Sequence, residues 1–149
     1  MSSDKIRHKT RVAVYLIGLQ GSKVLLGKRI NTGHMDGYWS LPAGHVYEGE
    51  SCTKAFIREM AEECGFNFSA SELNLVGSMY HRSGEFDYIN YIFKQDISNQ
   101  KFVNLEPNKC EALELFDVSN LPAMIPDYVK FMLDQTVHNN NPWICEYGF

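Results

Sequence analysis

The sequence has few features of a secreted, zinc-binding or membrane protein. None of its four cysteines forms a CxxC pair, so the usual spacing of a zinc site is missing. Scattered cysteines in a chain long enough to build a core are typical of reduced thiols in an intracellular protein. The longest apolar run, residues 12–17, is too short to cross a bilayer, and residues 1–10 lack an apolar signal core. We therefore expect a cytoplasmic protein that does not enter the membrane.

Positive charge is also not in excess. The 149 residues include 14 Lys and Arg against 18 Asp and Glu, which gives a formal net charge of -4 at pH 7. Binding along a nucleic acid requires clustered Lys and Arg to neutralise phosphates, so we expect no extended nucleic-acid surface. A small anionic ligand is still compatible, because a bound metal ion reverses the local field. Length and the 44% hydrophobic content favour one domain over residues 1–149.

Apolar periodicity and turn-forming residues predict an α/β fold with a mixed sheet. Strands are expected over residues 11–19, 23–29, 39–41, 72–82, 86–95 and 112–118. Loops are expected over residues 31–38, 43–50 and 99–109. One helix should run from about Ser51 to Cys64, and a second should begin after Pro126. Interleaved strands with one helix in the middle and one near the end favour an α/β sandwich.

The first predicted helix concentrates carboxylates on one face. Glu59, Glu62 and Glu63 stand at positions i, i+3 and i+4, so their side chains share that face. On spacing alone a solvated acidic face is the commoner interpretation. The alternative is a site for Mg²⁺, which takes oxygen ligands and is usually shared with substrate phosphates.

The segment before the helix favours the metal site. Gly44 allows the backbone to bend and its carbonyl to face an ion, and Glu50 adds a further carboxylate. Arg58 lies beside the cluster, where its guanidinium can fix a carboxylate through paired hydrogen bonds. The loop and helix together predict a metal site with acidic ligands.

These residues are similar to the signature of the Nudix hydrolase family. Gly44, five residues, Glu50, seven residues, and then REMAEECGF over residues 58–66 match the pattern GX5EX7REUXEEXGU, where U is apolar. Every fixed position over residues 44–66 agrees, so the resemblance is highly specific. It implies a Nudix-fold α/β/α sandwich that hydrolyses a nucleotide pyrophosphate bond with Mg²⁺, or with Mn²⁺ as an alternative.

The resemblance also implies roles for the matching residues. Glu59, Glu62 and Glu63 correspond to metal ligands, and the Gly44 carbonyl to a further ligand. Glu50 supports the site. Arg58 orients the glutamates.

The general base stays open between two residues. Glu63 is the candidate inside the motif, and Glu111 is the candidate downstream of it. Glu106 and Glu114 are weaker options.

The surroundings of the motif resemble the MutT-like branch, which cleaves nucleoside triphosphates to a monophosphate and pyrophosphate. An NDP-sugar, a dinucleotide or an RNA 5′ end is the alternative substrate. A nucleotide-binding regulatory domain without catalysis is the alternative of another class. Leu115 stands where the branch usually has Trp, and His45 stands where many relatives have a second glycine.

Substrate contacts are predicted from residue type alone. Aromatic rings stack on bases, and an Asp can accept a ring N–H. The candidates for the base are Tyr15, Tyr80, His81, Tyr88, Tyr91 and Asp127, and those for phosphate are Lys28, Arg29 and His45. In the tail, Trp143, Ile144, Tyr147 and Phe149 either cover the domain's own core or form a homodimer interface.

Overall fold

A computed structural model describes residues 5–149, so residues 1–4 of the predicted 1–149 domain lie outside it. The strands are β1 (Arg11–Gln20), β2 (Lys23–Arg29), β3 (Trp39–Ser40), β4 (Ala43–His45), β5 (Leu75–Ser83), β6 (Phe86–Asp96), β7 (Cys110–Asp117) and β8 (Trp143–Tyr147). The helices are α1 (Cys52–Cys64), the short 3-10 helix η1 (Ala70–Glu72) and α2 (Asp127–Val137). In this part of the chain neither α-helix is long and apolar enough to cross a membrane.

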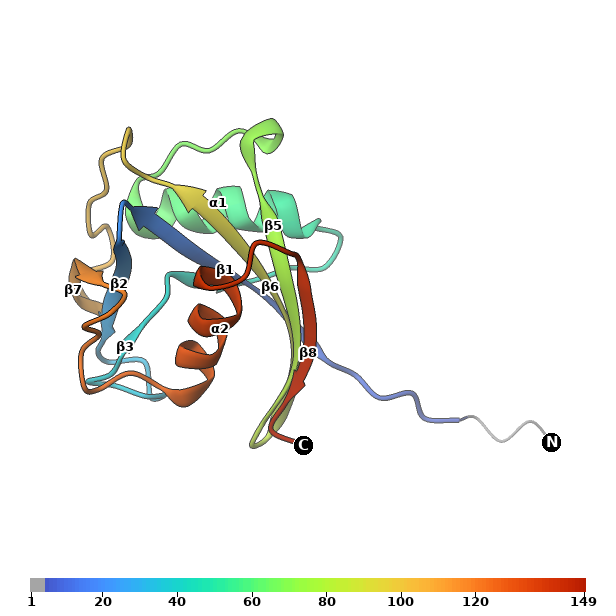
Figure 1. Cartoon of the computed structure of the whole chain (residues 1–149). Helices are drawn as coiled ribbons and strands as arrows, with labels where there is room; N and C mark the ends of the chain where they lie inside the picture. Colours follow the sequence, from blue (N-terminus) through green and yellow to red (C-terminus); the bar gives the residue numbers. More distant parts are fainter. Residues whose placement is uncertain (1–4) are drawn as a thin grey trace.

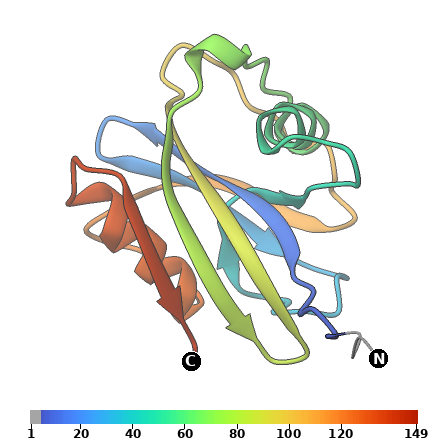
Figure 2. The same ribbon diagram turned by 90° about the vertical axis from the view of Figure 1, so that its right-hand side faces the viewer.

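The strands form one mixed sheet between the two α-helices. The order is β3-β2-β1-β6-β5-β8, while β4 pairs with β1 and β7 pairs with β2. The β1–β6 and β5–β8 pairs are parallel and the others are antiparallel. Helix α1 lies on one side of the sheet and α2 on the other (Figures 1 and 2). The predicted α/β/α sandwich with a mixed sheet is confirmed.

Each helix closes its own core against the sheet. On the α1 side, Phe56 and Met60 of the helix pack with Leu16 and Phe93 of the sheet. On the α2 side, Val129 and Met132 pack with residues such as Ile17 and Ile92. Successive residues of a strand point to opposite faces, so β1 and β6 supply both cores. A residue's position in a strand therefore decides which helix it faces.

The ends of α1 follow the sequence prediction. Ser51 caps the helix, since its side chain accepts a hydrogen bond from the Lys54 backbone N–H at 3.1 Å. Gly65 ends it with φ 72°, a left-handed conformation that glycine adopts at low cost. The α2 prediction is also confirmed, because that helix starts directly after Pro126.

The hairpin of β1 and β2 is confirmed but short. Its register covers only Leu19 with Val24 and Gln20 with Lys23, after which β2 pairs with β7 and β3. The part of β1 that does not pair with β2 pairs with β4 instead, and Val14 lies opposite Gly44. The prediction of an unstructured loop over residues 43–50 was therefore wrong for residues 43–45.

The tail forms a strand that the sequence analysis did not predict. Trp143 of β8 is buried over Gly77, where an added Cβ would meet the indole at 2.2 Å. The indole Nε1 donates to Thr136 Oγ1 at 3.1 Å. Trp143 thus covers the protein's own core, whereas Ile144 is 89% exposed. The start of the fifth strand was also placed too early, because η1 occupies residues 70–72.

Candidate active site

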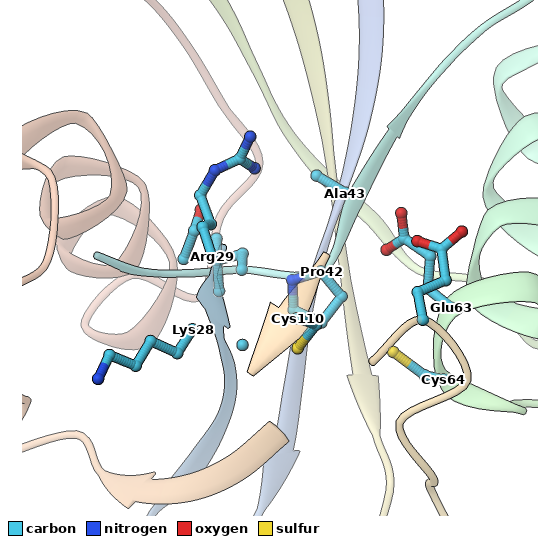
Figure 3. A pocket seen from close by; sticks show the side chains of 11 residues that line it. Lys28, Arg29, Pro42, Ala43, Glu63, Cys64 and Cys110 are labelled. Carbon is cyan, nitrogen blue, oxygen red and sulfur yellow. The ribbon is translucent and has the colours of Figure 1, made fainter. Parts of the chain in front are cut away.

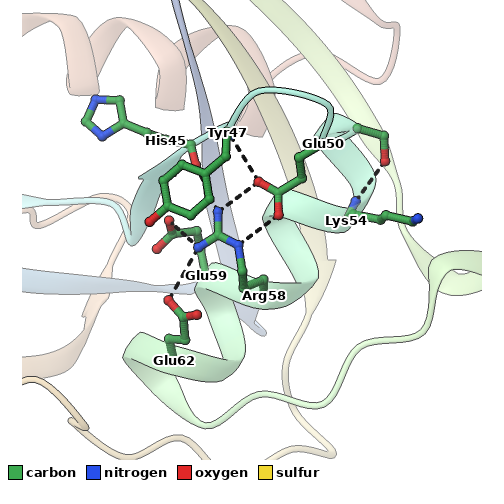
Figure 4. A network of polar contacts seen from close by, with 8 residues as sticks. His45, Tyr47, Glu50, Lys54, Arg58, Glu59 and Glu62 are labelled. Atoms are coloured by element: carbon green, nitrogen blue, oxygen red, sulfur yellow. Dashed lines mark hydrogen bonds and ion pairs between the residues drawn. The ribbon is translucent and has the colours of Figure 1, made fainter.

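Arg58 holds the acidic cluster together. Its Nε and Nη2 donate to the two carboxylate oxygens of Glu50 at 2.8 and 2.9 Å, a bidentate pair. Nη1 donates to Glu59 at 2.8 Å and more weakly to Glu62 at 3.4 Å. Nη2 also donates to the His45 carbonyl at 3.0 Å, which ties helix α1 to strand β4 (Figure 4). One guanidinium therefore orients three carboxylates and the strand beside them.

Glu50 is fixed as a charged partner of Arg58. Hydrogen bonding to Arg58 lowers the pKa of Glu50 to about 2, and the Tyr47 backbone N–H adds to this effect. The Tyr47 ring lies over the guanidinium, with the Arg58 Cζ 4.1 Å from its centroid (Figure 4). This geometry suits a supporting role for Glu50, because its oxygens are occupied by Arg58 rather than facing a ligand.

Gly44 has no side chain because the Glu59 carboxylate takes that space. A Cβ at position 44 would lie 2.1 Å from Glu59 Cδ. Real Cβ atoms do not approach other heavy atoms so closely, so glycine lets the carboxylate lie against the β4 backbone. Glu59 is buried, and this desolvation raises its pKa. Strand β4 and helix α1 thus bring the Gly44 backbone and the Glu59 carboxylate together, as the metal-site prediction requires.

Glu63 lies in the same site, next to a carboxylate from outside the motif. Burial raises the pKa of Glu63 to about 8, and the charges of Glu59 and Glu106 add to the rise. Glu106 comes from the loop between β6 and β7. The structure therefore adds a fourth acidic residue to the three on the helix.

The end of α1 positions the loop that carries Glu106. The backbone N–H groups of Val103 and Leu105 donate to the carbonyls of Cys64 and Glu63 at 3.0 and 3.1 Å. A helix leaves its last carbonyls without intrahelical partners, and here the loop satisfies two of them. Asn104 then accepts from the Glu106 N–H at 3.1 Å and donates to the Cys110 carbonyl at 2.7 Å.

Glu111, the downstream base candidate of the sequence analysis, does not reach this site. It lies on β7 and pairs with Lys28 at 3.0 Å, with 53% of its side chain exposed. Neither of the two cavities at the site includes Glu111 in its lining, whereas both include Glu63 and Glu106. Strand β7 turns Glu111 toward the Lys28 side of β2, away from the cleft that Glu106 lines.

A cleft of about 1080 Å³ opens over the acidic residues. Tyr15, Arg29 and His45 line it, as predicted for substrate contacts. Tyr80 and Asp127 do not. Tyr80 packs against Phe149 with ring centroids 4.9 Å apart, and Asp127 is an exposed residue at the start of α2. Residue type alone favoured both as base contacts. The strand face of Tyr80 and the position of Asp127 on its helix direct their side chains away from the cleft.

Several residues that line the cleft were not predicted from the sequence. Arg11 and Lys109 add cations to the cleft, and Tyr128 adds a ring from α2. Arg11 and Lys109 resemble the solvated cations found on any surface, and no local pattern distinguishes them. His81 and Tyr88, which were among the wider set of aromatic candidates, do line the cleft.

A smaller cavity of about 90 Å³ lies behind the acidic cluster, between β2 and the end of α1. Glu63, Arg29 and the thiols of Cys64 and Cys110 line it, while the Lys28 side chain extends away from Glu63 (Figure 3). Burial raises the pKa of both thiols, so they are protonated groups of the interior.

The donor set fits a hard divalent cation. Gly44 offers a backbone carbonyl. The three glutamates of the helix and Glu106 offer carboxylate oxygens, and oxygen ligands suit Mg²⁺ or Mn²⁺. Within residues 5–149 no three acidic, His or Cys side chains converge on one point. Arg58 Nη1 contacts both Glu59 and Glu62.

Comparisons with known proteins agree with this geometry. The NUDIX domain family model matches residues 7–135. The chain is 34% identical to an ADP-ribose pyrophosphatase of Methanocaldococcus jannaschii over 83% of this chain and 71% of that protein. It is 37% identical to an RNA pyrophosphohydrolase of Wolbachia pipientis subsp. Culex pipiens over 44% of this chain and 38% of that protein. The crystal structure of a MutT NUDIX hydrolase from Burkholderia pseudomallei superposes with a TM-score of 0.78 at 24% identity, covering 87% of this chain and 99% of the other.

Proposed function

The chain belongs to the NUDIX family of hydrolases, and we propose that it cleaves nucleoside triphosphates to a monophosphate and pyrophosphate with Mg²⁺. Enzymes of this family hydrolyse nucleoside diphosphate derivatives and generally need a divalent metal. One observation carries the choice of a nucleotide with a long phosphate chain. The same cleft holds the acidic cluster, the cations Arg11, Arg29 and Lys109, and a separate group of aromatic rings.

The acidic residues hold the ion, and the cations hold the phosphates. Glu59, Glu62, Glu63 and the Gly44 carbonyl are the groups placed to ligate Mg²⁺. When bound, the ion polarises a phosphoryl oxygen and acidifies water. Arg29 lies across the cleft from the carboxylates, where it orients the phosphate chain and offsets its charge. Arg58 is a positioning residue, since its contacts are with carboxylates and backbone.

The hydrolysis needs a group that takes a proton from the attacking water. The water oxygen forms a bond to phosphorus while the bridging P–O bond breaks, and the released pyrophosphate carries the electron pair away. Glu106 is our choice of base. It stands beside Glu59 and Glu63 but belongs to the loop, so its carboxylate remains free when the helix residues bind the ion. Glu63 is the alternative.

A nucleotide panel with product identification tests this function. We expect release of pyrophosphate from at least one nucleoside triphosphate in Mg²⁺, loss of activity with chelator, and recovery when Mg²⁺ is restored. Mn²⁺ in place of Mg²⁺ tests the choice of metal. Nucleotide binding without turnover in either metal would contradict an enzymatic role and favour a regulatory domain.

ADP-ribose is a second candidate substrate. The 34% identity to an ADP-ribose pyrophosphatase, over 71% of that protein, favours it. The same panel separates the two, because ADP-ribose gives AMP and ribose 5-phosphate whereas a triphosphate gives pyrophosphate. If ADP-ribose is the only substrate cleaved, the triphosphate assignment fails while the pyrophosphohydrolase assignment stands.

A further inference from the structure

Asn90 is a buried amide without a hydrogen-bond partner. It lies in the middle of β6 and is 1% exposed. Among residues 5–149 neither its Nδ2 nor its Oδ1 has a partner. Buried polar groups are nearly always paired, because leaving one unpaired destabilises the fold. A ligand with a matching donor and acceptor could form the hydrogen bonds that this buried amide lacks.

The strand register places Asn90 below the cleft. Its neighbours across the sheet are Ala13 on β1 and Met79 on β5, and paired residues point to the same face. Two residues along β6, Tyr88 lies on that face and lines the cleft. In the other direction, Ile92 belongs to the α2-side core. Asn90 itself does not line the cleft but lies between Tyr88, which lines it, and Ile92, which belongs to the core.

Small and aromatic residues surround this point. Ala13, the partner of Asn90 on β1, lines the cleft. The His81 ring packs against Tyr128 at a centroid distance of 4.9 Å. Tyr15 and Tyr128 both line the cleft, and burial raises the pKa of Tyr15. The end of the cleft on the α2 side is therefore lined by aromatic rings, which suit contact with a planar heterocycle.

We propose that Asn90 is the residue that reads the nucleobase, by pairing its amide with adjacent donor and acceptor atoms on the edge of the base. An Asn side chain offers two N–H donors and one acceptor in a plane, which matches a base edge. This inference rests on the proposed function, because it assigns the base end of the same cleft. Tyr88 is the ring that moves to admit the base, since it is only half-buried and its neighbour His45 is exposed, with centroids 5.9 Å apart.

Gln95 provides a matched control on the same strand. It is also a buried amide, but its Oε1 accepts from the Asn74 N–H at 2.6 Å and its Nε2 donates to the Glu72 carbonyl at 3.1 Å. It points to the α1 side, away from the cleft, because it is an odd number of residues from Asn90. Replacing each amide by leucine compares an unpaired group with a paired one at similar volume.

Calorimetric titration with AMP, GMP, CMP and UMP, and with inorganic pyrophosphate, tests the inference without requiring turnover. We expect Asn90→Leu to weaken the best-bound monophosphate about tenfold, the size of a lost base hydrogen-bond pair. Pyrophosphate affinity should be unchanged. The melting temperature should rise in Asn90→Leu, since an unpaired amide is removed, and fall in Gln95→Leu, which should bind every ligand normally.

Unchanged monophosphate binding in Asn90→Leu would overturn the inference, even if the enzyme cleaves nucleoside triphosphates. Loss of monophosphate binding in this variant would support it, even if the wild type cleaves no triphosphate and the proposed function fails. A loss of pyrophosphate binding equal to that of the monophosphates would also overturn it, because the defect would not be specific to the base. If Asn90→Leu does not fold, Asn90→Ala serves for the same titrations.

Discussion

At the scale of single residues, Arg58 orients the carboxylates of the acidic cluster, and Glu62 is the carboxylate that it holds least tightly. Glu62 is exposed, and its contact with Arg58 is the longest of the four carboxylate contacts that Arg58 makes. A long, solvated ion pair contributes at most about 1 kcal/mol to stability. We therefore expect Glu62 to contribute little to folding and to be available to bind an ion.

Replacing Glu62 with Gln should separate catalysis from stability. The change keeps the volume but removes one charge that the metal needs, so kcat should fall by about 10²-fold or more. The melting temperature should stay the same or rise, because repulsion with Glu59 is relieved. Glu114→Gln, an exposed acid on β7, is the control and should keep full activity. Near-normal turnover of Glu62→Gln would remove this residue from the metal site.

The choice of base is tested by a pair of equivalent substitutions. Glu106→Gln should lower kcat by about 10²- to 10⁴-fold, the usual contribution of a general base. Glu111→Gln should leave kcat unchanged, since its carboxylate pairs with Lys28 outside the cleft. Steady-state kinetics in saturating Mg²⁺ measures both. A large loss in Glu111→Gln with normal Glu106→Gln would reverse the assignment.

At the scale of elements, the close fit of β4 against α1 is the tightest constraint on the site. The Gly44 backbone and the Glu59 carboxylate occupy adjacent space. Gly44→Ala should push the carboxylate out, so the Mg²⁺ concentration for half-maximal activity should rise about tenfold or more. Gly21→Ala, at the β1–β2 turn with nothing within 4 Å, is the control. It adds a methyl group at positive φ, so it should cost stability but leave the Mg²⁺ requirement unchanged.

The elements also show what could be predicted from the sequence. Helix α1, its caps and its acidic face follow from local spacing, because Ser51, Gly65 and the glutamates act within a few turns of one another. Strands β4 and β8 could not be predicted in this way. The three residues of β4 are extended because they pair with a stretch of β1 that does not pair with β2. Strand β8 pairs with β5, where Trp143 packs over Gly77, a residue far away in the sequence.

The same reason explains Glu106. Its approach to Glu63 depends on backbone hydrogen bonds from Val103 and Leu105 to the end of α1, about forty residues earlier in the chain. No residue type or spacing marks such a contact. Asn90 is a similar case. The sequence shows a polar residue within an aromatic strand, but only the tertiary structure shows that its amide has no hydrogen-bond partner.

At the scale of the whole molecule, the two layers supply opposite ends of one cleft. The α1 layer provides negative charge, where we expect the ion to bind, while the α2 layer provides the Tyr128 ring. Strands β1 and β4 lie between them and contribute to both ends. A substrate that spans the cleft must be charged at one end and flat at the other, which describes a nucleotide.

We expect the charge at the α1 end to make the stability of the whole molecule depend on a divalent metal. Glu63 is half-buried beside Glu59 and Glu106, and burial together with these charges makes its ionisation unfavourable, raising its pKa to about 8. A ligand that binds only the folded state at about 100 times its Kd stabilises it by about 2.7 kcal/mol. For a chain of this length that corresponds to a rise in Tm of roughly 5 to 10 °C.

We therefore expect Mg²⁺ to raise the Tm measured by calorimetry relative to chelator. Glu63→Gln should melt higher than the wild type in chelator at pH 7, because folding keeps Glu63 protonated although the unfolded chain ionises it, and should gain little from Mg²⁺. Glu111→Gln, whose carboxylate lies outside the cleft, should match the wild type in both conditions. A full Mg²⁺ shift in Glu63→Gln would exclude Glu63 as a ligand. An unchanged Tm of that variant in chelator would show that repulsion does not limit the metal-free fold. Because the shift is an equilibrium property, it isolates ion binding from the chemistry that follows.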